Sequence, residues 1–161
     1  MKLEKAIFAC GCFWGAQYQF EHAKGVVRST VGYIGGHKEH PAYEEVKAHT
    51  TGHAEATLVE FDAEQTSFTE LCKLFFEIHD PAQTDGQGPD IGPQYRSEIF
   101  YQNDKQKEEA EAVIALLREK GYEVNTKLTP ATTFWEGEEY HQHYYDKTGG
   151  EPYCHIRIKK F

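Results

Sequence analysis

The sequence predicts an α/β or α+β fold, a two-layer sandwich in which helices cover a mixed β-sheet. Segments of strand length, either apolar throughout or alternating, are interspersed with amphipathic segments of helix length. The two kinds alternate only roughly, which favours a mixed sheet over a purely parallel one. With 161 residues, 39% of them hydrophobic and 14% aromatic, the chain can build one core, so residues 1–161 are expected to form a single domain.

The first third of the chain predicts a strand, a helix and a second strand. Residues 4–10 contain the apolar run 6–9 (AIFA) and predict a buried strand, and residues 13–23 follow as an amphipathic helix that Gly25 ends. Residues 26–34 (VVRSTVGYI) predict the second strand. Residues 37–52 are polar, and we expect them to be irregular.

The middle third predicts a strand, a helix and a long loop. Residues 53–61 (HAEATLVEF) alternate between apolar and polar residues, as a half-buried strand does. Ser67 and Glu70 form a capping box that begins a helix over residues 67–79. Residues 81–95 are rich in glycine and proline, and loops of this length are commonly functional.

The last third predicts one long helix, one short helix and further strands. Residues 104–120 place apolar side chains at helical spacing, and Gly121 ends that helix. A short helix is expected over residues 138–146. The remaining strands are expected over residues 97–101, 122–128 and 131–135.

The most informative feature is a cysteine between two glycines, in the segment Gly11–Gly15 (GCFWG). Because this segment joins the first strand to the first helix, Cys12 is expected at a helix N-terminus. The unpaired N–H groups and the helix dipole there favour the thiolate, which is the nucleophilic form of cysteine. Phe13 and Trp14 offer an apolar wall for a small group. The pattern therefore predicts a reactive cysteine with its own binding surface.

The other cysteines and the net charge narrow the class of protein. Cys10 and Cys72 lie in predicted elements and are expected in the core, whereas Cys154 could either swing toward a reactive partner or pack in a terminal strand. Four unevenly spaced cysteines do not make a disulfide-built fold, so we expect a cytoplasmic protein with reduced thiols. A net charge of −9 argues against nucleic acid or an anionic membrane as a partner.

Acids and phenols that could serve a reactive cysteine lie near the ends of predicted elements: Tyr33, Glu55, Asp90 and Tyr95. Each alone is more often a surface or capping residue. Together they suit the reduction of an S=O or O–O bond, which needs proton donors aimed at oxygen. A carboxyl buried beside aromatic rings has a raised pKa and can stay protonated at neutral pH, and two phenols can form a hydrogen-bonding cradle.

Three classes of protein share these features: a sulfoxide reductase, another thiol enzyme such as a peroxidase, and a metal-binding or redox-sensing module. The nine histidines favour the third class, but the cysteine and histidine spacings lack the usual zinc pattern. We therefore expect no metal site.

Seven sequence blocks separate these classes further. They occur in the order GCFWG (11–15), GYIGG (32–36), TGHAEATLVEF (51–61), HDPAQ (79–83), GPDIGPQYRS (88–97), YHQHYYDK (140–147) and YC (153–154). With these blocks the chain resembles the peptide methionine sulfoxide reductase A family over about residues 6–155. The resemblance implies an α/β sandwich of ferredoxin-like character and the reduction of methionine S-sulfoxide, protein-bound and free.

The resemblance also implies a role for each site residue. Cys12 would attack the sulfoxide sulfur, and Glu55 would protonate the sulfoxide oxygen. The remaining implied site residues are Phe13 and Trp14, which would bind the methyl group, the phenols Tyr33 and Tyr95, and Asp90, which would support the site through water.

Recycling of the enzyme is implied by the same resemblance. Cys12 would become a sulfenic acid, Cys154 would resolve it as a disulfide, and thioredoxin or another dithiol would reduce that disulfide. No cofactor is implied, and a monomer is expected. Pro93 stands where the family pattern has threonine, and the tail after Cys154 is short, so recycling by an external thiol is the alternative.

Overall fold

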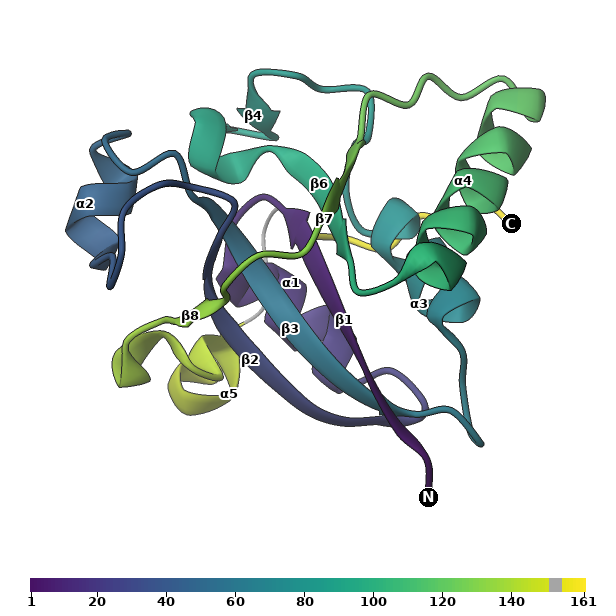
Figure 1. Cartoon of the computed structure of the whole chain (residues 1–161), viewed down its shortest axis with the longest axis horizontal. Coiled ribbons are helices and arrows are strands. Elements are labelled where there is room, and N and C mark those ends of the chain that lie inside the picture. Colours follow the sequence, from purple (N-terminus) through teal and green to yellow (C-terminus); the bar gives the residue numbers. More distant parts are fainter. Residues whose placement is uncertain (151–154) are drawn as a thin grey trace.

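The protein is described by a computed structural model that places residues 1–150 and 155–161. A six-stranded sheet with the order β7-β6-β1-β3-β2-β8 lies at its centre (Figure 1). Its strands are β1 (Leu3–Cys10), β2 (Val26–Ile34), β3 (Ala54–Asp62), β6 (Ser97–Tyr101), β7 (Lys127–Pro130) and β8 (Trp135–Glu136). Neighbouring strands are antiparallel, except that β6 and β7 are parallel, so the predicted mixed sheet is confirmed.

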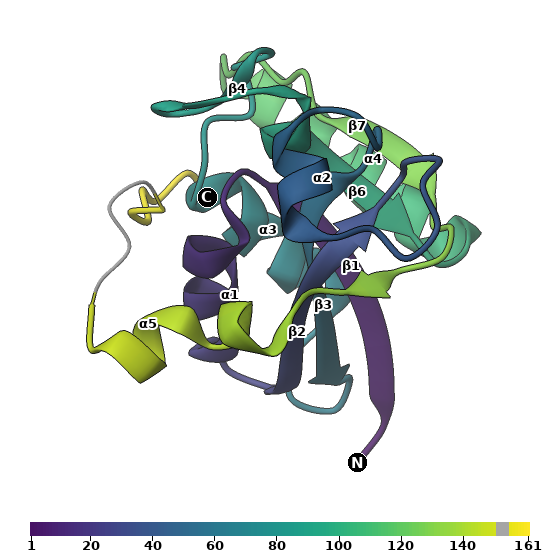
Figure 2. The same cartoon turned by 90° about the vertical axis from the view of Figure 1, so that its left-hand side faces the viewer.

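Three helices build the main core: α1 (Phe13–Glu21), α3 (Phe68–Glu77) and α4 (Asp104–Glu119). In Figure 2, α1 and α3 lie on the same side of β1 and β3. Successive residues of a strand point to opposite faces, so Phe8 packs with these helices while Ile7 joins a smaller cluster on the other face. The main elements run β1-α1-β2-β3-α3-β6, the β-α-β-β-α-β order of ferredoxin-like folds.

Local signals in the sequence explain why the long helices begin where they do. Ser67 accepts a hydrogen bond from the N–H of Glu70 (3.1 Å) and Asn103 accepts one from the N–H of Gln106 (2.9 Å), so each caps the helix that follows. The predicted helices over residues 67–79 and 104–120 are confirmed, with ends shifted by one or two residues.

Two segments that were expected to be irregular contain short elements. Helix α2 (Tyr43–Lys47) interrupts residues 37–52, and its first turn is supported by the Glu45 carboxylate, which accepts the N–H of Ala42 (3.0 Å). The long loop contains a small hairpin, β4 (Gly86–Gln87) and β5 (Asp90–Ile91), followed by the 3₁₀ turn η1 (Pro93–Tyr95).

The strand predictions at 122–128 and 131–135 are largely wrong. β7 begins only at Lys127, because backbone groups of the preceding residues bond outside the sheet: the N–H of Asn125 donates to the carbonyl of Pro81 in a loop, and the carbonyl of Val124 accepts from the Arg118 side chain of α4. Of residues 131–135, only Trp135 joins a strand, in β8.

The helix predicted over residues 138–146 is broken into the 3₁₀ turn η2 (Glu139–His141) and α5 (Tyr144–Thr148). The break falls at His143, whose φ is +54°. The N–H of His143 donates to the Gln17 side chain of α1 (2.6 Å) instead of to a carbonyl of its own helix. A tertiary contact therefore overrides the local helical pattern.

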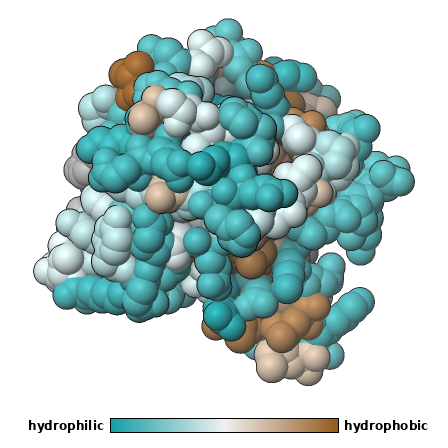
Figure 3. Space-filling view, turned by 60° about the vertical axis from the view of Figure 1, so that its left-hand side comes forward, coloured by the Kyte–Doolittle hydropathy of each residue, from teal (hydrophilic) through white to brown (hydrophobic). Residues whose placement is uncertain are grey.

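The face of the molecule that Figure 3 draws is mostly polar. On the face drawn in Figure 3, hydrophilic residues dominate and apolar ones form small separate groups. Among the described residues, none of the helices has both the length and the apolar composition that crossing a bilayer requires.

Candidate active site

The turn between β1 and α1 places Cys12 as the sequence predicts. Cys12 is the N-cap residue of α1 and is partly exposed. Gly11 has φ of +97°, a conformation that favours glycine, and a Cβ there would lie 2.7 Å from the Gln87 side chain. The sulfur therefore stands where the positive end of the helix dipole stabilises an anion.

Glu55, near the start of β3, lies beneath this turn. Its side chain is buried, and Oε1 accepts the N–H of Phe13 (3.3 Å), the residue directly after Cys12. Oε2 is buried with no hydrogen-bond partner among the described residues. Burial raises the pKa of Glu55 to about 8, the Phe13 N–H opposes this increase, and the charge of Asp90 adds to it. The raised pKa favours the protonated form of Glu55 at neutral pH, and a protonated carboxyl can donate a hydrogen bond.

Two phenols, Tyr43 and Tyr95, share this electrostatic environment. Burial raises the pKa of Tyr43 to about 12 and that of Tyr95 further, and for both the charges of Glu55 and Cys12 contribute to the increase. Both hydroxyls therefore stay protonated and can donate hydrogen bonds close to the acid and the thiol. Asp90 in β5 acts on Glu55 and Tyr95 through its charge, so the long loop reaches the site.

The hydroxyl of Tyr33 bonds to Glu138 and not to Glu55. Tyr33 pairs with Glu55 across β2 and β3, but its hydroxyl donates to Glu138 Oε1 (2.8 Å). The other oxygen of Glu138 accepts the N–H of Tyr43 (3.0 Å). Tyr33 therefore supports the segment that positions Tyr43, and the geometry favours Tyr43 over Tyr33 as the second phenol of the site. The sequence pattern Ala42–Glu45, with glutamate at the third position of a helix, could have drawn attention to Tyr43.

Phe13 is buried and Trp14 is half-buried, and two residues without a predicted role contact them. The Trp14 ring stacks on Tyr144 with 3.8 Å between centroids, and its indole N–H donates to His141 Nδ1 (2.9 Å). Phe13 packs against Tyr43 and His141. Since an indole N–H can only donate, His141 Nδ1 accepts, and burial lowers the pKa of this histidine so that it stays neutral.

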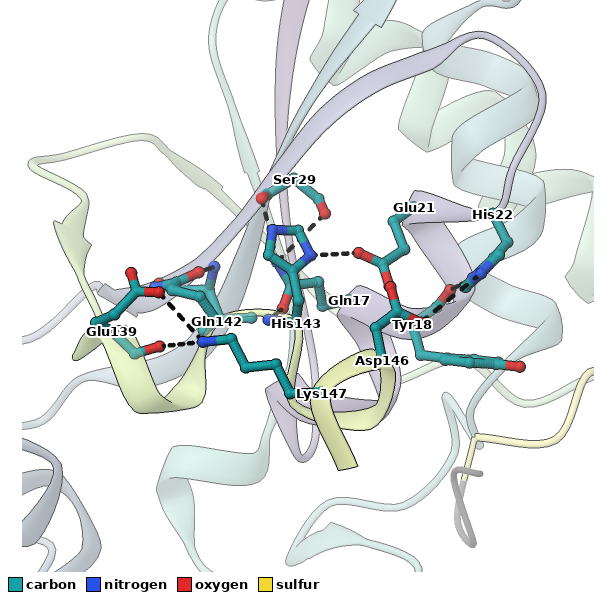
Figure 4. A network of polar contacts seen from close by, with 11 residues as sticks. Gln17, Tyr18, Glu21, His22, Ser29, Glu139, Gln142, His143, Asp146 and Lys147 are labelled. Carbon is teal, nitrogen blue, oxygen red and sulfur yellow. Dashed lines mark hydrogen bonds and ion pairs between the residues drawn. The ribbon is translucent and has the colours of Figure 1, made fainter. Parts of the chain in front are cut away.

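A polar network fixes η2 and α5 to α1 (Figure 4). His143 bonds through its backbone to Gln17 and through its ring to Glu21 (2.5 Å). Glu21, His143 and Asp146 are also the one group of described side chains that could together hold a metal ion. This group lies near the C-terminal end of α1, about 13 Å along the helix from Cys12.

The remaining cysteines separate into two cases. Cys10 and Cys72 are buried, as expected, and burial raises the pKa of Cys72 well above that of an exposed thiol. Cys154 belongs to residues 151–154, which lie outside the described residues. Its expected role as the resolving thiol therefore stays a prediction.

Comparisons with known proteins identify the family of the chain. The family described as peptide methionine sulfoxide reductase matches residues 4–161. Curated relatives named peptide methionine sulfoxide reductase MsrA include one from Acinetobacter baumannii, 44% identical over 97% of this chain and 90% of its own, and one from Geobacter sulfurreducens, 48% identical over 92% and 93%.

Solved structures give the same result. Mxr1 of Saccharomyces cerevisiae in its reduced form matches with a TM-score of 0.89 and 33% identity, over 99% of this chain and 93% of that one. The same yeast protein has been solved in complex with Trx2, and that structure matches with a TM-score of 0.64 and 23% identity, over 99% and 91% of the two chains.

Proposed function

Because the chain belongs to the peptide methionine sulfoxide reductase family, it reduces methionine sulfoxide, and we propose that Cys12 is the nucleophile and Glu55 the acid of this reaction. The observation that supports the pair most strongly is the hydrogen bond from the Phe13 N–H to a buried, protonated carboxyl. This bond joins the carboxyl to the residue directly after Cys12, and the other carboxyl oxygen, which has no hydrogen-bond partner among the described residues, supports its assignment as the group that meets the substrate.

Substrate binding follows from the arrangement of the site. The methyl group of the sulfoxide packs against Phe13 and Trp14, while the oxygen accepts hydrogen bonds from Glu55 and from the hydroxyls of Tyr43 and Tyr95. Asp90 supports this cradle through its charge and through water. With the methyl group and the oxygen bound in this way, the direction from which Cys12 attacks the sulfur is the third fixed point, so the site selects one sulfoxide epimer, which we assign as the S form.

The chemical step transfers oxygen between two sulfurs. The Cys12 thiolate attacks the sulfoxide sulfur as Glu55 gives its proton to the oxygen. The attack forms an S–S bond between Cys12 and the substrate. The hydroxyl group then passes from the substrate sulfur to the Cys12 sulfur: the substrate S–O bond and the S–S bond break, an S–O bond to Cys12 forms, and methionine leaves with the electron pair of the S–S bond. Methionine gains two electrons and Cys12 loses two, so Cys12 becomes a sulfenic acid.

Recycling needs a second thiol. We assign this role to Cys154, whose sulfur attacks the sulfenic sulfur, forms a disulfide with Cys12 and releases water. A dithiol protein of the thioredoxin class then reduces the disulfide, an assignment supported by the complex of yeast Mxr1 with Trx2. The substrates are methionine sulfoxide in proteins and as the free amino acid. The proposed setting is a monomer, one catalytic domain over residues 1–161, in the reducing cytoplasm, with no nucleic-acid or membrane partner.

The assignment is tested by reduction of a peptide containing methionine S-sulfoxide. Cys12→Ser lowers the rate at least about a thousandfold, because the nucleophile is lost. Glu55→Gln at neutral pH loses about tenfold, because an amide still donates a hydrogen bond to the oxygen. Cys72→Ser, which removes a buried thiol far from the turn, is the matched control and keeps the parent rate. A Cys12→Ser variant that still forms methionine contradicts the assignment.

A further inference from the structure

His155, the first described residue after Cys154, is fully buried against the turn that carries Cys12. Its ring Nε2 lies 2.7 Å from the carbonyl oxygen of Cys10, the last residue of β1. Because a carbonyl only accepts, Nε2 carries the proton and donates. The backbone oxygen of His155 in turn accepts the side-chain N–H of Gln19 in α1 (2.7 Å). One residue thus joins the C-terminal tail to both elements that flank Cys12.

The imidazole of His155 occupies space that the glycines on either side of Cys12 leave open. A Cβ on Gly15 would lie 2.3 Å from Nδ1 of this ring, which no real contact tolerates. A Cβ on Gly11 would lie 3.6 Å from Nε2. The ring therefore packs directly over the first turn of α1, and the second glycine of the GCFWG segment is required by this packing.

The rest of the tail is fixed as well, at α3. The N–H of Ile158 donates to the carbonyl of Glu77 (2.8 Å), Arg157 pairs with the Glu77 carboxylate (2.8 Å), and the N–H of Lys160 donates to the same carboxylate (3.0 Å). Figure 2 shows the tail running beside α3, with the C-terminus next to it. His155 is the contact of this tail nearest in sequence to Cys154.

We propose that His155 is a positioning residue for recycling: it anchors the chain directly after Cys154 at the Cys12 turn, so that sulfenic acid and resolving thiol meet quickly. The inference rests on the proposed function, in which Cys154 resolves Cys12. Consecutive Cα atoms are about 3.8 Å apart, so a residue joined to an anchored neighbour has a short reach. Holding two reacting groups near each other raises their effective concentration and speeds their reaction.

The test separates the first turnover from recycling. The full chain is mixed with a stoichiometric methionine S-sulfoxide peptide and no external thiol, and methionine formation and the Cys12–Cys154 disulfide are followed over time. His155→Ala is expected to keep the rate of methionine formation within about twofold of the parent. Disulfide formation is expected to slow about tenfold or more, as the sulfenic acid accumulates. His155→Gln, which retains an N–H donor for the Cys10 carbonyl, recovers most of the lost rate.

Gln106→Ala is the matched control. The buried Gln106 of α4 donates a side-chain hydrogen bond to the Lys5 carbonyl of β1 (2.8 Å) and accepts the N–H of Gln102 (2.9 Å), so it also joins a neighbouring element to β1 but does not contact the tail. If loss of stability alone slowed recycling, this variant would slow it too, and the proposal would fail.

The remaining outcomes are distinct. Equal disulfide rates in His155→Ala and the parent overturn the positioning role while leaving the proposed function intact. A parent that forms no methionine overturns the proposed function itself. A parent that forms methionine but links Cys12 to another cysteine overturns the assignment of Cys154, and the positioning role with it.

Discussion

Replacing Glu55 by glutamine is expected to stabilise the protein, and by an amount that grows with pH. The carboxyl has a pKa of about 8 in the folded chain against 4.5 when exposed, because it is buried. Glutamine cannot ionise, and its amide oxygen can still accept the Phe13 N–H that Glu55 accepts. The substitution therefore removes an ionisation penalty while it preserves the contact with the turn of Cys12.

The sign and size of the effect follow from proton linkage. Below pH 4.5 the carboxyl is protonated in both states and makes no difference. Between pH 4.5 and 8 only the unfolded chain releases this proton, so unfolding becomes easier as the pH rises. Above pH 8 the folded protein bears the full cost of ionising Glu55, and the difference between the two pKa values corresponds to a loss of roughly 5 kcal/mol in the free energy of unfolding. The loss is roughly 3 kcal/mol at pH 7 and less than about 1 kcal/mol at pH 5.

Urea denaturation of both proteins, with reductant present and at several pH values from 5 to 9, measures this difference. Glu111→Gln, which changes an exposed carboxyl of α4, is the control and is expected to show no comparable trend. If Glu55→Gln changes the free energy of unfolding equally at both ends of the pH range, the carboxyl is not held protonated by the fold. The role of Glu55 as an acid at neutral pH would then have no basis.

Two further predictions concern residues that the tertiary structure singles out. Tyr43→Phe is expected to lower the rate of sulfoxide reduction at least about tenfold, since it removes a donor near the acid. Tyr33→Phe is expected to lower the free energy of unfolding by about 1–3 kcal/mol, because it removes the hydrogen bond to Glu138, and to change the rate less than Tyr43→Phe does. Urea denaturation measures the stability of both variants and steady-state kinetics their rates. A larger loss of rate in Tyr33→Phe than in Tyr43→Phe would restore Tyr33 as the second phenol. Gly15→Ala is expected to destabilise the parent by about 1–3 kcal/mol, because the added Cβ clashes with the His155 ring. In a His155→Ala background the same change is expected to stabilise the protein by about 0.5–1 kcal/mol, because alanine favours a helix over glycine. Thermal or urea unfolding of the parent, the two single variants and the double variant checks this change of sign, and equal effects in both backgrounds would show that the ring does not fill this space.

The sequence predicted most of the regular structure, because the signals for it are local. The apolar run that forms β1, the capping serine of α3 and the apolar spacing of α4 each act over a few residues. It failed where distant contacts decide the conformation. The break at His143 depends on Gln17, and the N–H of Asn125, within the segment predicted as a strand, donates to the carbonyl of Pro81 in a distant loop.

For the site, the sequence by itself determined the chemistry: a cysteine at a strand-to-helix turn, a carboxyl on the following strand pair, and aromatic residues beside the thiol. Only the tertiary structure decided which phenol we assign to the site beside the acid, what holds Trp14, and what fills the space above Gly15. The reason is physical. Tyr33 reaches Glu138, Trp14 reaches His141 and His155 reaches Cys10, over separations of more than 100 residues. Such pairings depend on how sheet and helices pack, and local residue patterns contain no record of them.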